Sequence, residues 1–127
     1  MPNLVPPVDN VEAARQYRDR IIALVPQVST FEPRMTLYLT RNTTPAVIRE
    51  AKQAGFVQAF KLYPAGATTN SEAGIDSIRS LYPLFEVMQE VDMPLAVHGE
   101  VTDPDTDLSA RYAVFIDRHT RNAQKPT

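Results

Sequence analysis

The stretch FKLYPAGATTNS, residues 60–71, ends an apolar run with a lysine and continues into a polar loop. The run Phe56–Leu62 is short, apolar and β-prone, which predicts a strand. A charged ammonium is costly to bury, so Lys61 either extends to solvent, pairs with a carboxylate or loses its charge. A neutral lysine amine is a nucleophile that can form a Schiff base or take up carbon dioxide as a carbamate. All of these states remain open for Lys61 at this point.

Helix-like and strand-like segments alternate on both sides of this strand. This order predicts parallel strands joined by right-handed helical crossovers, and therefore an α/β fold. Residues 1–5 are a possible stub of an earlier strand. The other predicted strands are 35–40 and 94–98, and the predicted helices are 11–25, 45–54, 75–88 and 108–121.

Helix ends are marked by residues with known capping behaviour. Asp9 or Asn10 is expected to cap the first helix, and Thr44 the second, with proline at its first position. Gly55 is expected to end that second helix. Pro83 lies inside the third helical pattern, where it predicts a kink or a break.

The composition is that of a soluble globular protein. The chain has 127 residues, of which 43% are hydrophobic and 22% charged, enough for one domain with one core. Its net charge of −2 and pI of about 5.6 provide no basic surface for nucleic acid or an anionic membrane. The absence of cysteine excludes disulfides and thiolate metal sites. With no apolar run of transmembrane length and no signal peptide, the expected location is cytoplasmic.

Polar side chains stand at the predicted strand ends. In α/β folds these positions and the loops after them collect functional groups on one rim. For a lone histidine in this position, a structural hydrogen bond is the commoner role. The rim residues are Asn3, Thr40, Lys61 with Tyr63, and His98 with Glu100.

Three alternating aspartates in VTDPDTDLS, Asp103, Asp105 and Asp107, resemble part of a calcium loop. The glycine and the closing glutamate of that loop are missing. A polar turn that caps the next helix is therefore the expected role of this segment.

Longer motifs match a known family. MPN at 1–3 with PP at 6–7, KLYPAGATTNS at 61–71 and MPLAVHGEVTD at 93–103 resemble the bacterial-type dihydroorotase of the amidohydrolase superfamily. The resemblance extends from Met1 to about Asp117. It implies a zinc-dependent enzyme that reversibly cyclises N-carbamoyl-L-aspartate to dihydroorotate in pyrimidine biosynthesis.

The resemblance also implies site residues. Lys61 corresponds to the carboxylated lysine that bridges two zinc ions, and His98 to a histidine ligand. Asn3 corresponds to the asparagine that binds the substrate's carboxylate. Thr68 and Thr69 correspond to threonines of a mobile loop that closes over the ligand and hydrogen-bonds to it.

Some parts of the family pattern are not found in the sequence. The family has an earlier strand with His-x-His and a nearby arginine, and later strands with another histidine ligand and the general-base aspartate. We therefore expect one partial domain, residues 1–127, that forms roughly half of a (β/α)₈ barrel, strands two to five. Residues 118–127 lack the family's usual apolar residues and are expected to be a non-native or disordered tail. Such a piece is expected to be inactive alone and to self-associate through open sheet edges.

Two other functions remain. A Schiff-base lyase of the aldolase type would use Lys61 as its amine, but this leaves His98 and the threonine loop unexplained. A non-enzymatic remnant or subunit would use the open sheet to bind a partner, although no partner motif supports it. Borohydride trapping on Lys61 would favour the lyase, and dependence on zinc and bicarbonate the dihydroorotase.

Overall fold

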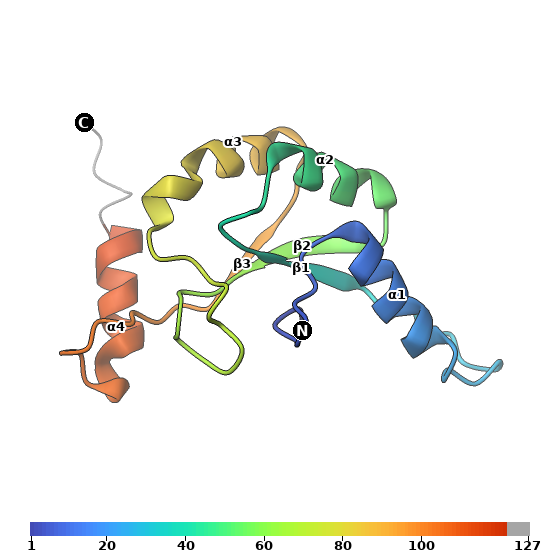
Figure 1. Ribbon diagram of the computed structural model, residues 1–127, viewed down its shortest axis with the longest axis horizontal. Helices are drawn as coiled ribbons and strands as arrows, with labels where there is room; N and C mark the ends of the chain where they lie inside the picture. Colours follow the sequence, from blue (N-terminus) through green and yellow to red (C-terminus); the bar gives the residue numbers. More distant parts are fainter. Residues whose placement is uncertain (122–127) are drawn as a thin grey trace.

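A computed structural model describes residues 1–121, with a three-stranded parallel sheet at its centre (Figure 1). The strands β1 (Met35–Leu39), β2 (Val57–Leu62) and β3 (Leu95–Val97) lie side by side in sequence order. All three occur where the sequence predicts a strand. In this register Lys61 of β2 lies opposite Tyr38 of β1 on one side and Ala96 of β3 on the other.

Helices alternate with these strands, as the α/β prediction requires. The first two helices begin at the expected caps, and the second also ends at its expected glycine. The first ends at Ile22, three residues earlier than predicted. The Asn10 side chain accepts a hydrogen bond from the Ala13 amide, and Thr44 accepts one from Val47. Gly55 ends the second helix with a φ of 76°, in the left-handed region that glycine tolerates. The bounds are α1 Val11–Ile22, α2 Pro45–Ala54, α3 Tyr82–Glu90 and α4 Arg111–Ile116.

The two later helices are shorter than predicted. Residues Ile78–Leu81 form a 3₁₀ turn, and α3 starts only at Tyr82. Pro83 therefore lies in the first turn of α3, where no backbone donor is needed. The last predicted helix divides into a 3₁₀ turn (Leu108–Ala110), α4 and a π-helical turn (Asp117–Arg121). Most of the predicted tail, residues 122–127, lies outside the described part of the chain.

The predicted strand at residues 1–5 is wrong, because this segment has no strand conformation. It does lie close to β1: the Tyr38 amide donates to the Val8 carbonyl at 2.8 Å, and the Val8 amide donates to the Pro2 carbonyl at 2.9 Å. One contact with β1 is too little to make a ladder. It is enough to bring Asn3 to the neighbourhood of the sheet.

The two faces of the sheet have different roles. Helices α2 and α3 cover one face (Figure 1), where Leu37 and Leu39 of β1 and Phe60 and Leu62 of β2 are buried in the core. Side chains alternate along a strand, so Tyr38 and Lys61 belong to the opposite face. In a (β/α)₈ barrel, this opposite face is the interior.

The sheet stays open at β3. Within the described residues β3 pairs only with β2, and Val97 is 40% exposed. The parallel strands and crossover helices agree with the predicted barrel units, although three strands cannot close a barrel. No helix described in residues 1–121 is long and apolar enough to span a membrane.

Candidate functional site

Three of the predicted rim residues meet around a fourth, Tyr63, just beyond the end of β2. The Tyr63 hydroxyl donates a 2.8 Å hydrogen bond to Asn3 Oδ1. Lys61 Nζ lies 5.3 Å from the centre of the Tyr63 ring, and the His98 ring lies 5.7 Å from it. Residues far apart in sequence therefore converge, as expected for the carboxyl ends of parallel strands.

The loop that follows Tyr63 is held firmly at its base. The Ile75 amide donates to the Tyr63 carbonyl at 2.9 Å, and the Ala65 amide to the Ile75 carbonyl at 3.1 Å. Ser71 is fully buried; its Oγ donates to the Thr68 carbonyl at 2.6 Å and accepts from the Thr68 amide at 3.0 Å. The base is thus built from hydrogen bonds internal to the loop.

The tip of the loop rests on Asn3. Asn3 Nδ2 donates to the Thr69 carbonyl at 3.0 Å, and Asn70 Nδ2 donates to the Asn3 carbonyl at 3.2 Å. Thr68 and Thr69 are exposed. The structure therefore joins the predicted carboxylate-binding residue to the predicted threonine loop. Asn70, whose φ is 55°, was missed by the sequence reasoning, although asparagine commonly adopts this backbone region.

His98 is fixed to the sheet by its backbone. Its amide donates to the Leu62 carbonyl at 2.8 Å, which continues the ladder beyond β3. Its Nε2 lies 3.4 Å from Glu100 Oε1, within ion-pair range, but the geometry of a hydrogen bond is not met. The Nε2 atom is buried without a hydrogen-bond partner, so the structure leaves it available as a ligand.

Thr40, the remaining rim residue, serves a local purpose. Its amide donates to Thr43 Oγ1 at 3.0 Å, and its own Oγ1 accepts from the Asn42 amide at 3.3 Å. These contacts form the turn between β1 and α2. The hydroxyl of Thr40 is therefore used in the turn, apart from the Tyr63 cluster.

Tyr38 lies beneath the cluster, and sequence reasoning did not single it out. Its ring meets the Tyr63 ring edge-on, with centroids 5.1 Å apart and planes at 71°. The side chain is completely buried, yet its hydroxyl has no hydrogen-bond partner. Burial, helped by the negative charges that Tyr63 and Glu72 can carry, raises the pKa of Tyr38 to about 12.

Replacing Tyr38 with phenylalanine is expected to leave the free energy of unfolding unchanged or raise it by about 1 kcal/mol, because a buried unpaired hydroxyl is removed. The folded pKa of about 12 lies above the ordinary 10.0. Tyr38 therefore contributes stability that is complete below pH 10 and falls as pH rises toward 12. Urea denaturation at about pH 8 and about pH 11 should show a smaller alkaline loss in the variant. A clear destabilisation at the lower pH would contradict this.

The aspartate segment forms the predicted polar turn. Asp107 Oδ1 accepts from the Ser109 amide at 2.8 Å at the start of the turn before α4. Asp103 Oδ2 accepts from Arg118 Nη1 at 2.7 Å, and this hydrogen bond holds the pKa of Asp103 below its usual value. Among residues 1–121 there is no group of three His, Cys, Asp or Glu side chains placed to hold a metal.

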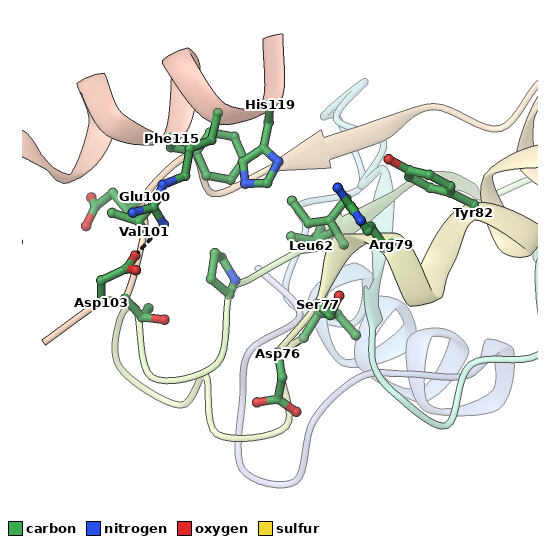
Figure 2. A pocket seen from close by; sticks show the side chains of 15 residues that line it. Leu62, Asp76, Ser77, Arg79, Tyr82, Glu100, Val101, Asp103, Phe115 and His119 are labelled. Atoms are coloured by element: carbon green, nitrogen blue, oxygen red, sulfur yellow. Dashed lines mark hydrogen bonds and ion pairs between the residues drawn. The ribbon is translucent and has the colours of Figure 1, made fainter. Parts of the chain in front are cut away.

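A separate cavity of about 610 Å³ lies between the loop after β3, α4 and the segment before α3 (Figure 2). Its lining includes Asp76, Arg79, Glu100, Asp103 and His119. Neither Asn3 nor Lys61 lines it. The cavity is lined by Leu62 and Pro64, which flank Tyr63, and by Glu100, which contacts His98. None of the predicted ligand-binding side chains lines it, so it is not the site that the sequence predicts.

Two side chains at the cluster have the chemistry of metal ligands. Lys61 as a carbamate would provide carboxylate-like oxygens, and His98 Nε2 has no hydrogen-bond partner. A zinc ion in a catalytic site usually has three protein ligands and a water molecule. Lys61 and His98 could therefore provide some of the ligands of a zinc site, but the described residues do not provide a complete set. No metal-dependent step can be assigned to these residues alone.

Comparison with known proteins identifies similar chains. No protein-family model matches the sequence. The chain is 61% identical over 117 residues to the dihydroorotase of Ralstonia pickettii (strain 12J), and the matched region covers 92% of this chain and 34% of that enzyme. It is 60% identical over 121 residues to the dihydroorotase of Pseudomonas fluorescens (strain SBW25), covering 95% and 35%.

Solved structures give the same result. The dihydroorotase of Campylobacter jejuni superposes with a TM-score of 0.83 at 37% identity, covering 97% of this chain and 35% of that one. The dihydroorotase of Saccharomyces cerevisiae, solved in complex with 5-fluoroorotic acid, superposes with a TM-score of 0.79 at 37% identity, covering 92% and 34%. The chain therefore matches dihydroorotases over nearly its whole length and spans about a third of theirs.

Proposed function

We propose that this chain carries part of the active site of a cytoplasmic, zinc-dependent dihydroorotase, which reversibly cyclises N-carbamoyl-L-aspartate to dihydroorotate. The meeting of Asn3, Lys61 and His98 around Tyr63 supports this most strongly. It occurs in a chain about 60% identical to curated dihydroorotases. In this proposal residues 1–127 are one partial domain of the barrel.

Each residue has a role that its position allows. Lys61, as a carbamate, and His98 would hold zinc, which when bound lowers the pKa of a water molecule and polarises the scissile carbonyl. Asn3 would bind the substrate's carboxylate through its amide. Thr68 and Thr69, exposed on the loop tip beside Asn3, would add hydrogen bonds and help to exclude bulk water.

A graft tests this proposal. The 117 residues of this chain that match the R. pickettii dihydroorotase would replace their counterpart in that enzyme. The graft should restore growth without added pyrimidines to a bacterial strain that lacks dihydroorotase. The same graft with His98 replaced by alanine is the matched negative control. Failure of a soluble, well-expressed graft to support growth would count against the proposal.

The chain by itself is expected to show no dihydroorotate hydrolysis above the blank, even with zinc and bicarbonate. The reason is that the described residues provide Lys61 and His98 but no group of three conventional ligands. Chromatographic assay of product formation is the measurement. Zinc-dependent turnover by the purified chain that disappears in Lys61→Ala would show this expectation to be wrong.

We also propose that the chain self-associates in solution through the open edge at β3. Backbone groups on this edge can pair with another strand, and Val97 beside them is 40% exposed. Light scattering during size-exclusion chromatography should give a mass above the 14.2 kDa of one chain. A dilute sample that is monomeric and melts in one cooperative transition would refute this.

A further inference from the structure

Tyr63 has no assigned role in the proposed function, although it is the residue on which the cluster converges. It is 1% exposed, and its hydroxyl is hydrogen-bonded to Asn3 Oδ1 at 2.8 Å. We propose that the Tyr63 hydroxyl is a positioning group that orients the Asn3 amide and so holds the loop tip, residues 68–70, against it. The importance of Asn3 for a ligand rests on the proposed function.

The hydrogen bonds determine which way the Asn3 amide faces. A carbonyl oxygen can only accept, so the Thr69 carbonyl requires the Nδ2 end of Asn3 at 3.0 Å. The Oδ1 end then faces Tyr63, whose hydroxyl donates to it.

The Tyr63 ring is a rigid support for this bond. It packs edge-on against the buried Tyr38 ring, and its backbone carbonyl accepts from the Ile75 amide. The hydroxyl is therefore fixed with respect to the sheet. Asn3 is bonded to the tip twice: its side-chain amide donates to the Thr69 carbonyl, and its backbone carbonyl accepts from Asn70 Nδ2. The Tyr63 hydroxyl acts on the tip through the first of these bonds, because it is bonded to the same side-chain amide.

The base of the loop does not depend on this connection. Ser71 and the backbone bonds between Tyr63, Ala65 and Ile75 hold it independently. Loss of the Tyr63 hydroxyl should therefore release the tip and leave the base in place. An Asn side chain has two N–H donors, so the second one can meet a ligand carboxylate while the first holds Thr69.

The absence of cysteine allows a direct test on the chain itself. A nitroxide label on Thr68→Cys reports the mobility of the exposed tip by electron paramagnetic resonance. The label is compared in four backgrounds: unchanged, Tyr63→Phe, Asn3→Ala and both together. Tyr82→Phe is the matched control, since Tyr82 is 56% exposed. A label on Gln53→Cys, exposed on α2, monitors general loosening.

We expect Tyr63→Phe and Asn3→Ala to raise the mobile fraction at position 68 equally, with no further rise in the double variant, because both break one connection. The label at position 53 and the Tyr82→Phe control should not change. An unchanged tip in Tyr63→Phe, additive effects, or equal loosening at position 53 would each overturn the proposal.

A second measurement separates this proposal from the proposed function. In the graft, Tyr63→Phe should raise KM for dihydroorotate about tenfold, with a smaller change in kcat, since one hydrogen bond that orients Asn3 is lost. A fall in kcat with KM unchanged would contradict a positioning role. An inactive graft combined with a released tip would refute the dihydroorotase assignment and leave the role of Tyr63 in place.

Discussion

Replacing Lys61 with alanine in the graft is expected to lower zinc-dependent dihydroorotate hydrolysis roughly a thousandfold or more. As a carbamate, Lys61 would contribute oxygen ligands to the proposed zinc site, so its loss should remove bound zinc and the chemistry that zinc would supply. Lys61 is half-buried beside the Tyr63 ring, near the end of β2. Hydrolysis rate and bound zinc per graft are the two measurements.

Lys52→Ala is the matched control for this prediction. Lys52 is exposed on α2, where it contacts Asp92 and has no part in the proposed site. The hydrolysis rate and the zinc content of Lys52→Ala should therefore stay close to those of the unchanged graft. Retention of zinc and rate in Lys61→Ala would refute a ligand role. If borohydride instead trapped a substrate on Lys61 without zinc, the Schiff-base alternative would be favoured.

Replacing Gly74 with alanine is expected to reduce the free energy of unfolding by about 3 kcal/mol, which a small open domain tolerates poorly. A Cβ atom at this position would lie 2.5 Å from the Tyr63 carbonyl oxygen and 2.8 Å from that of Ser71. Both neighbours are backbone atoms of the loop base, so neither can move away alone. Urea denaturation of the chain measures the change.

Gly66→Ala is the matched control in the same loop. Its φ is +73° and no atom lies within 4 Å of the added Cβ, so only the left-handed backbone is strained. That strain should cost about 1 kcal/mol. A loss in Gly74→Ala no greater than in Gly66→Ala would mean that the loop base is not packed as described.

Much of the fold follows from local signals in the sequence. Asn10, Thr44 and Gly55 mark helix ends by chemistry that depends only on the nearest residues, and each is confirmed. Pro83 correctly predicts a break, but not that the preceding turn would be 3₁₀. The strand expected at residues 1–5 fails because a strand needs a partner along its length, and apolar sequence alone does not provide one.

For the site, the sequence predicts which residues come together but not the contacts between them. Lys61, Tyr63 and His98 are placed together by the rule that the carboxyl ends of parallel strands share a rim. The connections between them depend on tertiary geometry that one sequence does not contain. The unpaired hydroxyl of Tyr38 and the fully buried Ser71 are of this kind. So is the bonding of the loop tip to Asn3, a residue more than sixty positions away.

The rate of dihydroorotate hydrolysis by the purified, zinc-loaded graft tests the central claim most directly. If this chain carries Asn3, Lys61, His98 and the threonine loop of a dihydroorotase site, the graft should work within about tenfold of the R. pickettii enzyme, a difference of about 1.4 kcal/mol in the activation free energy. A folded graft that binds zinc but does not hydrolyse dihydroorotate would contradict the account.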